Sequence, residues 1–204
     1  YILSHCNIIT WNTILLVHVE HGQGRMALML HKLMYEENVS PDGHTFAISL
    51  QACINLMEED DVVIDVKRTK LIAREIGLAL HADVERRGLF EINLGMGNIV
   101  MEMYIQCGLL PKALQVFEKL PFRNEVSWNT LIKGYAELGH SVEAIKCFEM
   151  MLQEGIFPSI VSFVCVLKAS NYCIGNLTLR AWEVHYFEDL LLERAIHIGN
   201  AMVI

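Results

Sequence analysis

Three asparagines recur at one position of an internal repeat. Asn12 and Asn98 precede Asn129 by 117 and 31 residues, and other residues recur at the same two offsets. A short primary amide both donates and accepts hydrogen bonds, so a row of such amides could recognise the polar edge of a ligand. A single asparagine near a helix start is usually a cap or a solvated residue. Three at one repeat position, with Asn200 at a fourth, favour a shared binding role.

A second candidate for chemistry is His18-Val19-Glu20, which superficially matches the H-x-E motif of zinc deaminases. In that motif the histidine binds zinc and the glutamate is the general acid/base. No P-C-x-x-C motif follows in the chain, and His18 falls inside a predicted repeat helix. The six cysteines show no C-x-x-C pair and no metal-ligand spacing with histidine, which favours free buried thiols. We therefore expect no catalytic residue, no metal and no cofactor.

The residues that accompany the asparagines define the repeat that must position them. At an offset of 117, one set recurs: Trp11, Gly22, Ala27, Met34 and Pro41 return as Trp128, Gly139, Ala144, Met151 and Pro158. At an offset of 31, Asn98, Tyr104, Gly108, Ala113 and Phe117 return as Asn129, Tyr135, Gly139, Ala144 and Phe148. Self-similarity with a period in the thirties is typical of helical hairpin arrays. We expect an all-α fold, a right-handed α-solenoid of about five helix-turn-helix hairpins.

Glycine turns and prolines between the apolar helical stretches give the unit boundaries. The predicted units are residues 8–42, 43–93, 94–124, 125–159 and 160–195, with 196–204 starting a further one. Unit 43–93 is 15 residues longer than unit 160–195, and the surplus falls near 57–71, beside the acidic run Glu58-Glu59-Asp60-Asp61. An acidic run without a calcium-loop glycine is typical of a solvated loop. We expect this stretch to loop out or pack poorly, with the second helix resuming near Ile72.

Composition limits the possible partners. The formal net charge of −8 argues against tight, non-specific electrostatic binding to nucleic acid, but not against stacking and base-edge hydrogen bonds. No apolar run approaches the ~20 residues that a membrane-spanning helix needs, so we expect no membrane contact. The chain begins at Tyr1 without a methionine, and both ends cut through a repeat. We expect it to be a fragment of a longer protein.

The unit lengths and several phrases resemble the pentatricopeptide repeat family, and more narrowly its plant-type subfamily of alternating P, L and S repeats. The phrases that carry the resemblance are residues 97–108, 113–124 and 126–132, and the likeness covers nearly the whole chain apart from 57–71. It implies that 8–42 and 125–159 are P units, 43–93 and 160–195 are L units, and 94–124 is an S unit. A tetratricopeptide array fits less well because its period is constant.

This resemblance implies recognition of single-stranded RNA, one base per repeat. The implied base-reading pairs are Asn12 with Asp42, Asn98 with Asn124, and Asn129 with Ser159. In the family's code these pairs suggest uridine, a pyrimidine and cytidine, in that order.

Further positions of each unit carry implied roles. Ile9 and Val126 take the position that wedges between bases, whereas Gly95 departs from it and should grip weakly. The L units offer Ala47 with Asn93 and Val164 with Ala195, which cannot make the amide contacts, so we expect little readout there.

The resemblance also implies a setting. It points to a mitochondrial or chloroplast RNA-processing factor, most often one serving C-to-U editing, with other RNA-editing factors as partners and no small-molecule substrate. A protein-binding helical scaffold stays open as the alternative, and the acidic charge mildly favours it. Amides and small aliphatic residues on the concave face would favour bases. Bulky apolar and charged residues there would favour a peptide.

Overall fold

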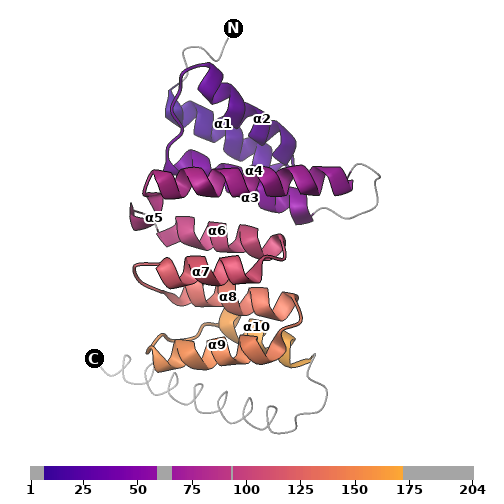
Figure 1. The fold of residues 1–204 in the computed structure, drawn as a ribbon, viewed down its shortest axis with the longest axis vertical. Helices are drawn as coiled ribbons and strands as arrows, with labels where there is room; N and C mark the ends of the chain where they lie inside the picture. Colours follow the sequence, from indigo (N-terminus) through magenta and orange to yellow (C-terminus); the bar gives the residue numbers. More distant parts are fainter. Residues whose placement is uncertain (1–6, 59–65, 93, 172–204) are drawn as a thin grey trace, which may run out of the picture.

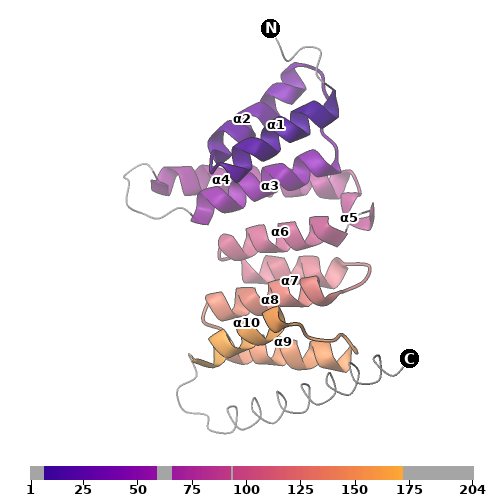
Figure 2. The ribbon, with the colours of Figure 1, turned by 180° about the vertical axis from the view of Figure 1, so that it is seen from behind.

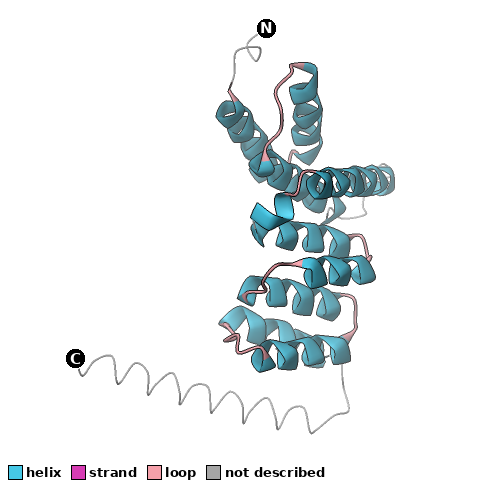
Figure 3. Cartoon of the chain, turned by 60° about the vertical axis from the view of Figure 1, so that its left-hand side comes forward, coloured by secondary structure: helices cyan, strands magenta, loops and turns pink. Residues whose placement is uncertain are grey.

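A computed structural model describes residues 7–58, 66–92 and 94–171 of the chain. Within these ranges every regular element is a helix, and turns or short loops join the helices (Figure 3). The prediction of an all-α helical repeat solenoid is confirmed. The second half of the predicted unit 160–195 and the start of a further unit at 196–204 lie outside the described residues, as do Asn93, Ala195 and Asn200.

The helices form hairpins that stack along one axis (Figure 1). The hairpins are α1 (Ile8–Glu20) with α2 (Gly24–Glu36), α3 (Gly43–Glu58) with α4 (Val66–Arg86), α6 (Leu94–Gln106) with α7 (Leu110–Lys119), and α8 (Glu125–Glu137) with α9 (Ser141–Gln153). The short α5 (Leu89–Ile92) links α4 to α6, and α10 (Ile160–Asn171) follows α9. Gly108 and Gly139 turn two of these hairpins at φ +69° and +79°, a conformation that glycine adopts without steric cost.

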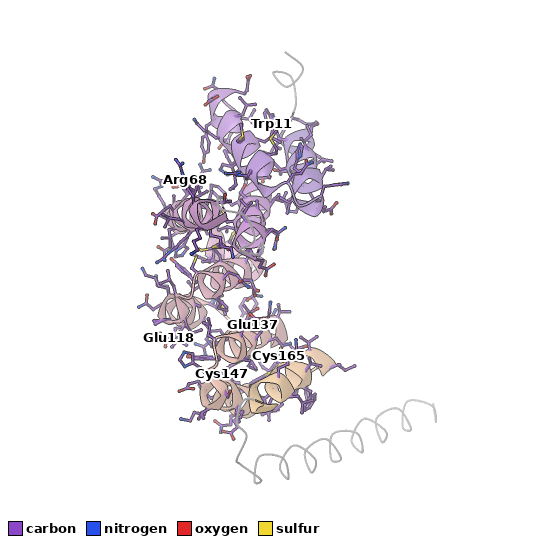
Figure 4. The ribbon with its side chains drawn as sticks, turned by 90° about the vertical axis from the view of Figure 1, so that its right-hand side faces the viewer. Trp11, Arg68, Glu118, Glu137, Cys147 and Cys165 are labelled. Atoms are coloured by element: carbon purple, nitrogen blue, oxygen red, sulfur yellow. The ribbon has the colours of Figure 1, made fainter. Side chains whose placement is uncertain are left out.

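The stack has two layers. The first helices are α1, α3, α6, α8 and α10, and each of the first four packs against the next one along the chain. The second helices form the other layer, in which α4, α7 and α9 lie nearer the viewer in Figure 1 and farther away in Figure 2. The stack bends toward the first helices, so their solvent-facing side is concave (Figure 4). We call this side the inner face.

Apolar side chains fill the space between the layers. The largest fully buried ones include Trp11, Phe46, Trp128 and Phe148. Helices also approach closely at small residues: a Cβ on Gly24 would lie 2.9 Å from Leu56 Cγ. Cys53, Cys107, Cys147 and Cys165 are free thiols in the described part of the chain. Among the described helices, none combines the length and the apolar character that a bilayer crossing requires.

The surplus of the second unit is more helical than the sequence suggests. α3 runs through Glu58, and α4 begins at Val66 rather than near Ile72. Met57 and Thr69 are 8% and 6% exposed. The prediction that 57–71 loops out is therefore wrong for the two ends of that stretch, because Thr69 continues the helical spacing of the buried Ala73 and Leu80. Residues 59–65 lie outside the described residues.

Candidate functional site

The residues that precede the first helices α3, α8 and α10 cap them. The side-chain oxygen of Asp42 accepts from the Thr45 backbone N–H at 2.8 Å, and that of Asn124 accepts from the Ser127 N–H at 3.0 Å. Ser159 Oγ accepts from the Val161 N–H at 3.2 Å. Short polar side chains at this position satisfy backbone donors that the helix leaves unpaired. Three of the predicted site residues therefore have a structural role.

Counting from the start of the first helix gives every unit the same frame. The fifth residue of the helix is Asn12 in α1, Asn98 in α6 and Asn129 in α8. Neighbouring first helices pack together, and the predicted partner of each of these asparagines is the residue just before the next first helix along the chain: Asp42, Asn124 and Ser159. The frame places the predicted partners of each pair on adjacent first helices.

Asn12 and Asp42 meet directly. Asn12 Nδ2 donates to Asp42 Oδ1 at 3.1 Å, and the Thr45 hydroxyl donates to Asn12 Oδ1 at 2.7 Å. Asn12 is 7% exposed. Burial disfavours the Asp42 carboxylate, but hydrogen bonds from Thr45 and Asn12 outweigh burial and hold its pKa below the ordinary value. The carboxylate is therefore ionised at neutral pH.

The other two pairs are arranged differently. Asn129 Nδ2 donates to Glu125 Oε1 at 3.1 Å. Asn129 Oδ1 and Asn98 Oδ1 are buried and have no hydrogen-bond partner within the described part of the chain. No side-chain hydrogen bond among the described residues joins Asn98 to Asn124 or Asn129 to Ser159. An unpaired buried acceptor costs about 1–3 kcal/mol, which a ligand N–H could recover.

The position two residues after the cap presents apolar side chains to solvent. Ile9 is 70% exposed and Val126 is 55% exposed. Val161 is 58% exposed and occupies the same position in α10. The sequence carried the signal for Val161, since it follows Ser159 as Val126 follows Asn124. Gly95 leaves the position without a side chain in α6.

The remaining predicted positions belong to the L units. Ala47 is half-buried in α3, and Val164 is 43% exposed in α10. Neither side chain carries a hydrogen-bonding group.

Charge is distributed unevenly between the two layers. The described first helices carry five glutamates and two lysines: Glu20, Glu58, Glu102, Glu125, Glu137, Lys133 and Lys168. Most lysines and arginines of the described residues lie on the second helices. The layer that holds the asparagines is therefore acidic overall.

Features that would indicate an enzyme are weak. His18 lies within α1, and its Nδ1 is 2.5 Å from Gln23 Oε1. Among the described residues, no three His, Cys, Asp or Glu side chains gather as metal ligands would. Burial raises the pKa of Cys53 and of Cys147 to about 12, so both thiols are neutral packing groups.

Replacing Asp42 by alanine should destabilise the fold by about 1 kcal/mol, because α3 loses its cap. Replacing Asp42 by asparagine keeps an oxygen for the Thr45 N–H and should cost less. Urea denaturation of both variants would check this. Equal losses in the two variants would contradict the capping role.

Comparison with known proteins identifies a family of helical repeats. The model described as the PPR repeat family matches residues 7–55 and 123–170, and the PPR repeat model matches residues 98–124. Relatives from Arabidopsis thaliana include a pentatricopeptide repeat-containing protein that is 31% identical over 180 residues, with coverage of 88% of this chain and 32% of the relative. A second relative, named chloroplastic, is 32% identical over 200 residues, covering 97% of this chain and 22% of its own length. The chain thus spans about a third or less of the length of these relatives.

A solved structure shares the fold. The crystal structure of the pentatricopeptide repeat protein PPR10 from maize matches with a TM-score of 0.62 and 21% identity over 90% of this chain and 24% of that one. At this identity the likeness supports the helical repeat architecture alone.

Proposed function

Because the chain belongs to the pentatricopeptide repeat family, we propose that its inner face binds single-stranded RNA and reads one base at each of units 8–42, 94–124 and 125–159. The observation that carries the proposal is the pair of unpaired acceptors, Asn98 Oδ1 and Asn129 Oδ1, at equivalent positions of adjacent first helices. Each of the four RNA bases presents at least one N–H donor on its Watson–Crick edge. A base could supply the missing hydrogen bond.

The chemistry of the paired residues supports a preference for pyrimidines. Ionised Asp42 can only accept hydrogen bonds, so it suits the N3–H of uracil and disfavours the bare N3 of cytosine. The Ser159 hydroxyl can donate as well as accept, which is compatible with cytosine N3. Asn124 can do either, consistent with a less selective pyrimidine site.

The exposed aliphatic side chains supply the second contact. Ile9, Val126 and Val161 extend from the starts of α1, α8 and α10 into solvent. A base that lies against such a side chain removes apolar surface from water, and the gain does not depend on the base's hydrogen-bonding edge. These residues would hold the bases apart while the amides read them. The L units would span one nucleotide each without reading it.

One base-specific experiment tests this function. In a longer array that carries unit 125–159, changing Ser159 to Asp should shift the base preferred opposite that unit from cytosine to uracil. Changing Asn129 to Ala should weaken binding by about 1 kcal/mol, the usual value for one neutral hydrogen bond. Fluorescence anisotropy with RNAs that differ at a single base measures both effects.

The matched control is Val142→Asp on α9, at a side chain 54% exposed on the other layer. It adds the same charge and should leave base preference unchanged. An unaltered preference in Ser159→Asp would overturn base reading by this pair.

We also propose that the chain is part of a longer plant-type factor with P, L and S repeats that processes organellar RNA, with C-to-U editing as the leading role. Its proposed location is the chloroplast or the mitochondrion, and three of the relatives are named chloroplastic, which supports the chloroplast. Other RNA-editing factors would be its partners. Sequencing organellar transcripts from cells without the full-length protein tests this, because a lost editing or processing event identifies the target.

The competing function is a protein-binding scaffold. The excess of glutamate over lysine on the first helices favours it, since a basic peptide would complement that layer. The experiments above separate the two functions, because a peptide scaffold has no reason to prefer one base.

A further inference from the structure

Lys133 links two adjacent units through an ion pair. Its Nζ on α8 lies 2.7 Å from Glu102 Oε1 on α6 and 3.8 Å from Glu137 Oε1 on its own helix. The side chains of Lys133 and Glu102 are 41% and 21% exposed. Half-burial makes this pair less screened by salt than a fully solvated one.

The pair lies next to the proposed base-reading row. Lys133 follows Asn129 by four residues, and Glu102 follows Asn98 by four residues. Residues four apart on a helix share a face, so Lys133 and Glu102 lie one helical turn from the two asparagines. If RNA binds to those asparagines as proposed, its phosphates would lie near the same turn.

Few positively charged side chains lie on the same layer as Lys133. On the described first helices the other lysine is Lys168. Burial disfavours the Lys133 ammonium, but its hydrogen bond to Glu102 and the charges of Glu102, Glu137 and Glu58 outweigh burial and raise its pKa. The side chain is therefore a fixed cation inside an acidic group, and Glu58 is held there by a 3.1 Å hydrogen bond from Gln106 Nε2.

We infer that Lys133 is the phosphate contact of this part of the inner face, and that Glu102 holds it in a closed pair that RNA must open. The inference rests on the proposed function. Phosphate and the Glu102 carboxylate compete for one ammonium group, since each needs the same N–H donors. Glu102 thereby keeps sequence-independent affinity low, so that base contacts decide which RNA stays bound.

The test uses the whole chain and the variant Glu102→Gln. The probe is single-stranded RNA with the core U-A-U-C-A flanked by adenosines, in which adenosine fills the unread positions. The variant should bind this RNA roughly five-fold more tightly at low salt, because one charge-assisted phosphate contact is released from competition. The slope of log K against log salt should steepen by about 0.7, the contribution of one phosphate contact on a single strand.

Two further variants make the result specific. Adding Lys133→Gln to Glu102→Gln should abolish both the gain in affinity and the extra salt slope. Glu85→Gln is the matched control, because it breaks a similar 2.8 Å pair with Lys119 on the second helices. It should leave RNA affinity unchanged. Thermal melts of all variants establish that each is folded.

The outcomes separate this inference from the function beneath it. If the chain prefers the U-A-U-C-A core over an all-adenosine RNA, but Glu102→Gln changes neither affinity nor salt slope, the gating role of Glu102 is wrong. A gain that persists when Lys133 is also removed overturns Lys133 as the contact. If no variant distinguishes the two RNAs, the proposed function itself fails.

Discussion

Replacing Trp128 by alanine should lower the free energy of unfolding by about 3–5 kcal/mol, the usual cost of removing a large aromatic side chain from a core. Trp128 is fully buried at the start of α8. Its ring contacts that of Phe117 on α7 edge to face, with centroids 4.7 Å apart. The substitution therefore opens a cavity where two hairpins join. Urea denaturation of the whole chain measures the loss.

Two controls show whether lost packing is the cause. Trp128→Phe keeps an aromatic ring and removes an indole N–H that has no hydrogen-bond partner in the described part of the chain, so it should cost less than alanine. Phe122→Ala removes a ring that is 63% exposed and should cost little. A Trp128→Ala loss no larger than that of Phe122→Ala would contradict the packing argument.

Lowering the pH from 7 to 4 should remove about 3 kcal/mol of stability through His31. Burial lowers the pKa of His31 to about 4, partly opposed by the charge of Asp83 and assisted by that of Arg87. The pKa of an unfolded histidine is near 6.5. Between pH 4 and pH 6.5 the unfolded chain therefore binds a proton at this histidine that the folded chain does not bind. The contribution of neutral His31 to the free energy of unfolding is fully present above pH 6.5 and is lost as the pH falls toward 4. Urea denaturation at a series of pH values measures the slope.

The hydrogen bonds of His31 define its neutral form. The Ser49 hydroxyl donates to the Thr45 carbonyl at 2.8 Å, so it must accept from His31 Nδ1, 2.6 Å away. His31→Gln removes the titrating group and should flatten the pH dependence in this window, although the variant starts less stable. Burial also lowers the pKa of His81, so a smaller slope should persist. An undiminished slope in His31→Gln would point to another group.

Much of the fold follows from the spacing of the sequence. Apolar residues at helical intervals, separated by glycine turns, are sufficient to predict the stacked hairpins. The start of α4 was missed because the acidic run after Met57 suggested a loop, whereas burial of Thr69 against the core extends the helix back to Val66. At that point the helical spacing of buried residues was a better indicator of where α4 begins than the local run of acidic residues.

The candidate site was predictable in outline but not in its bonding. The repeat frame identifies Asn12 and Asp42 as neighbours, and the structure shows a hydrogen bond between them. The unpaired oxygen of Asn129 depends on side-chain torsions that a sequence does not specify. The Lys133–Glu102 pair had a usable signal, since opposite charges stand 31 residues apart at the same position of adjacent units.

The need to cap a helix restricts which residue types can stand at the proposed base-reading position. Asp42, Asn124 and Ser159 each end one unit and cap the next first helix. Asn, Asp, Ser and Thr are the side chains that cap best, and replacing one of them by alanine costs about 1 kcal/mol. Under the proposed function, a change of target base therefore proceeds most readily by exchange among these four residues. The set of side chains that could read a base at this position is therefore limited by the requirements of helix capping.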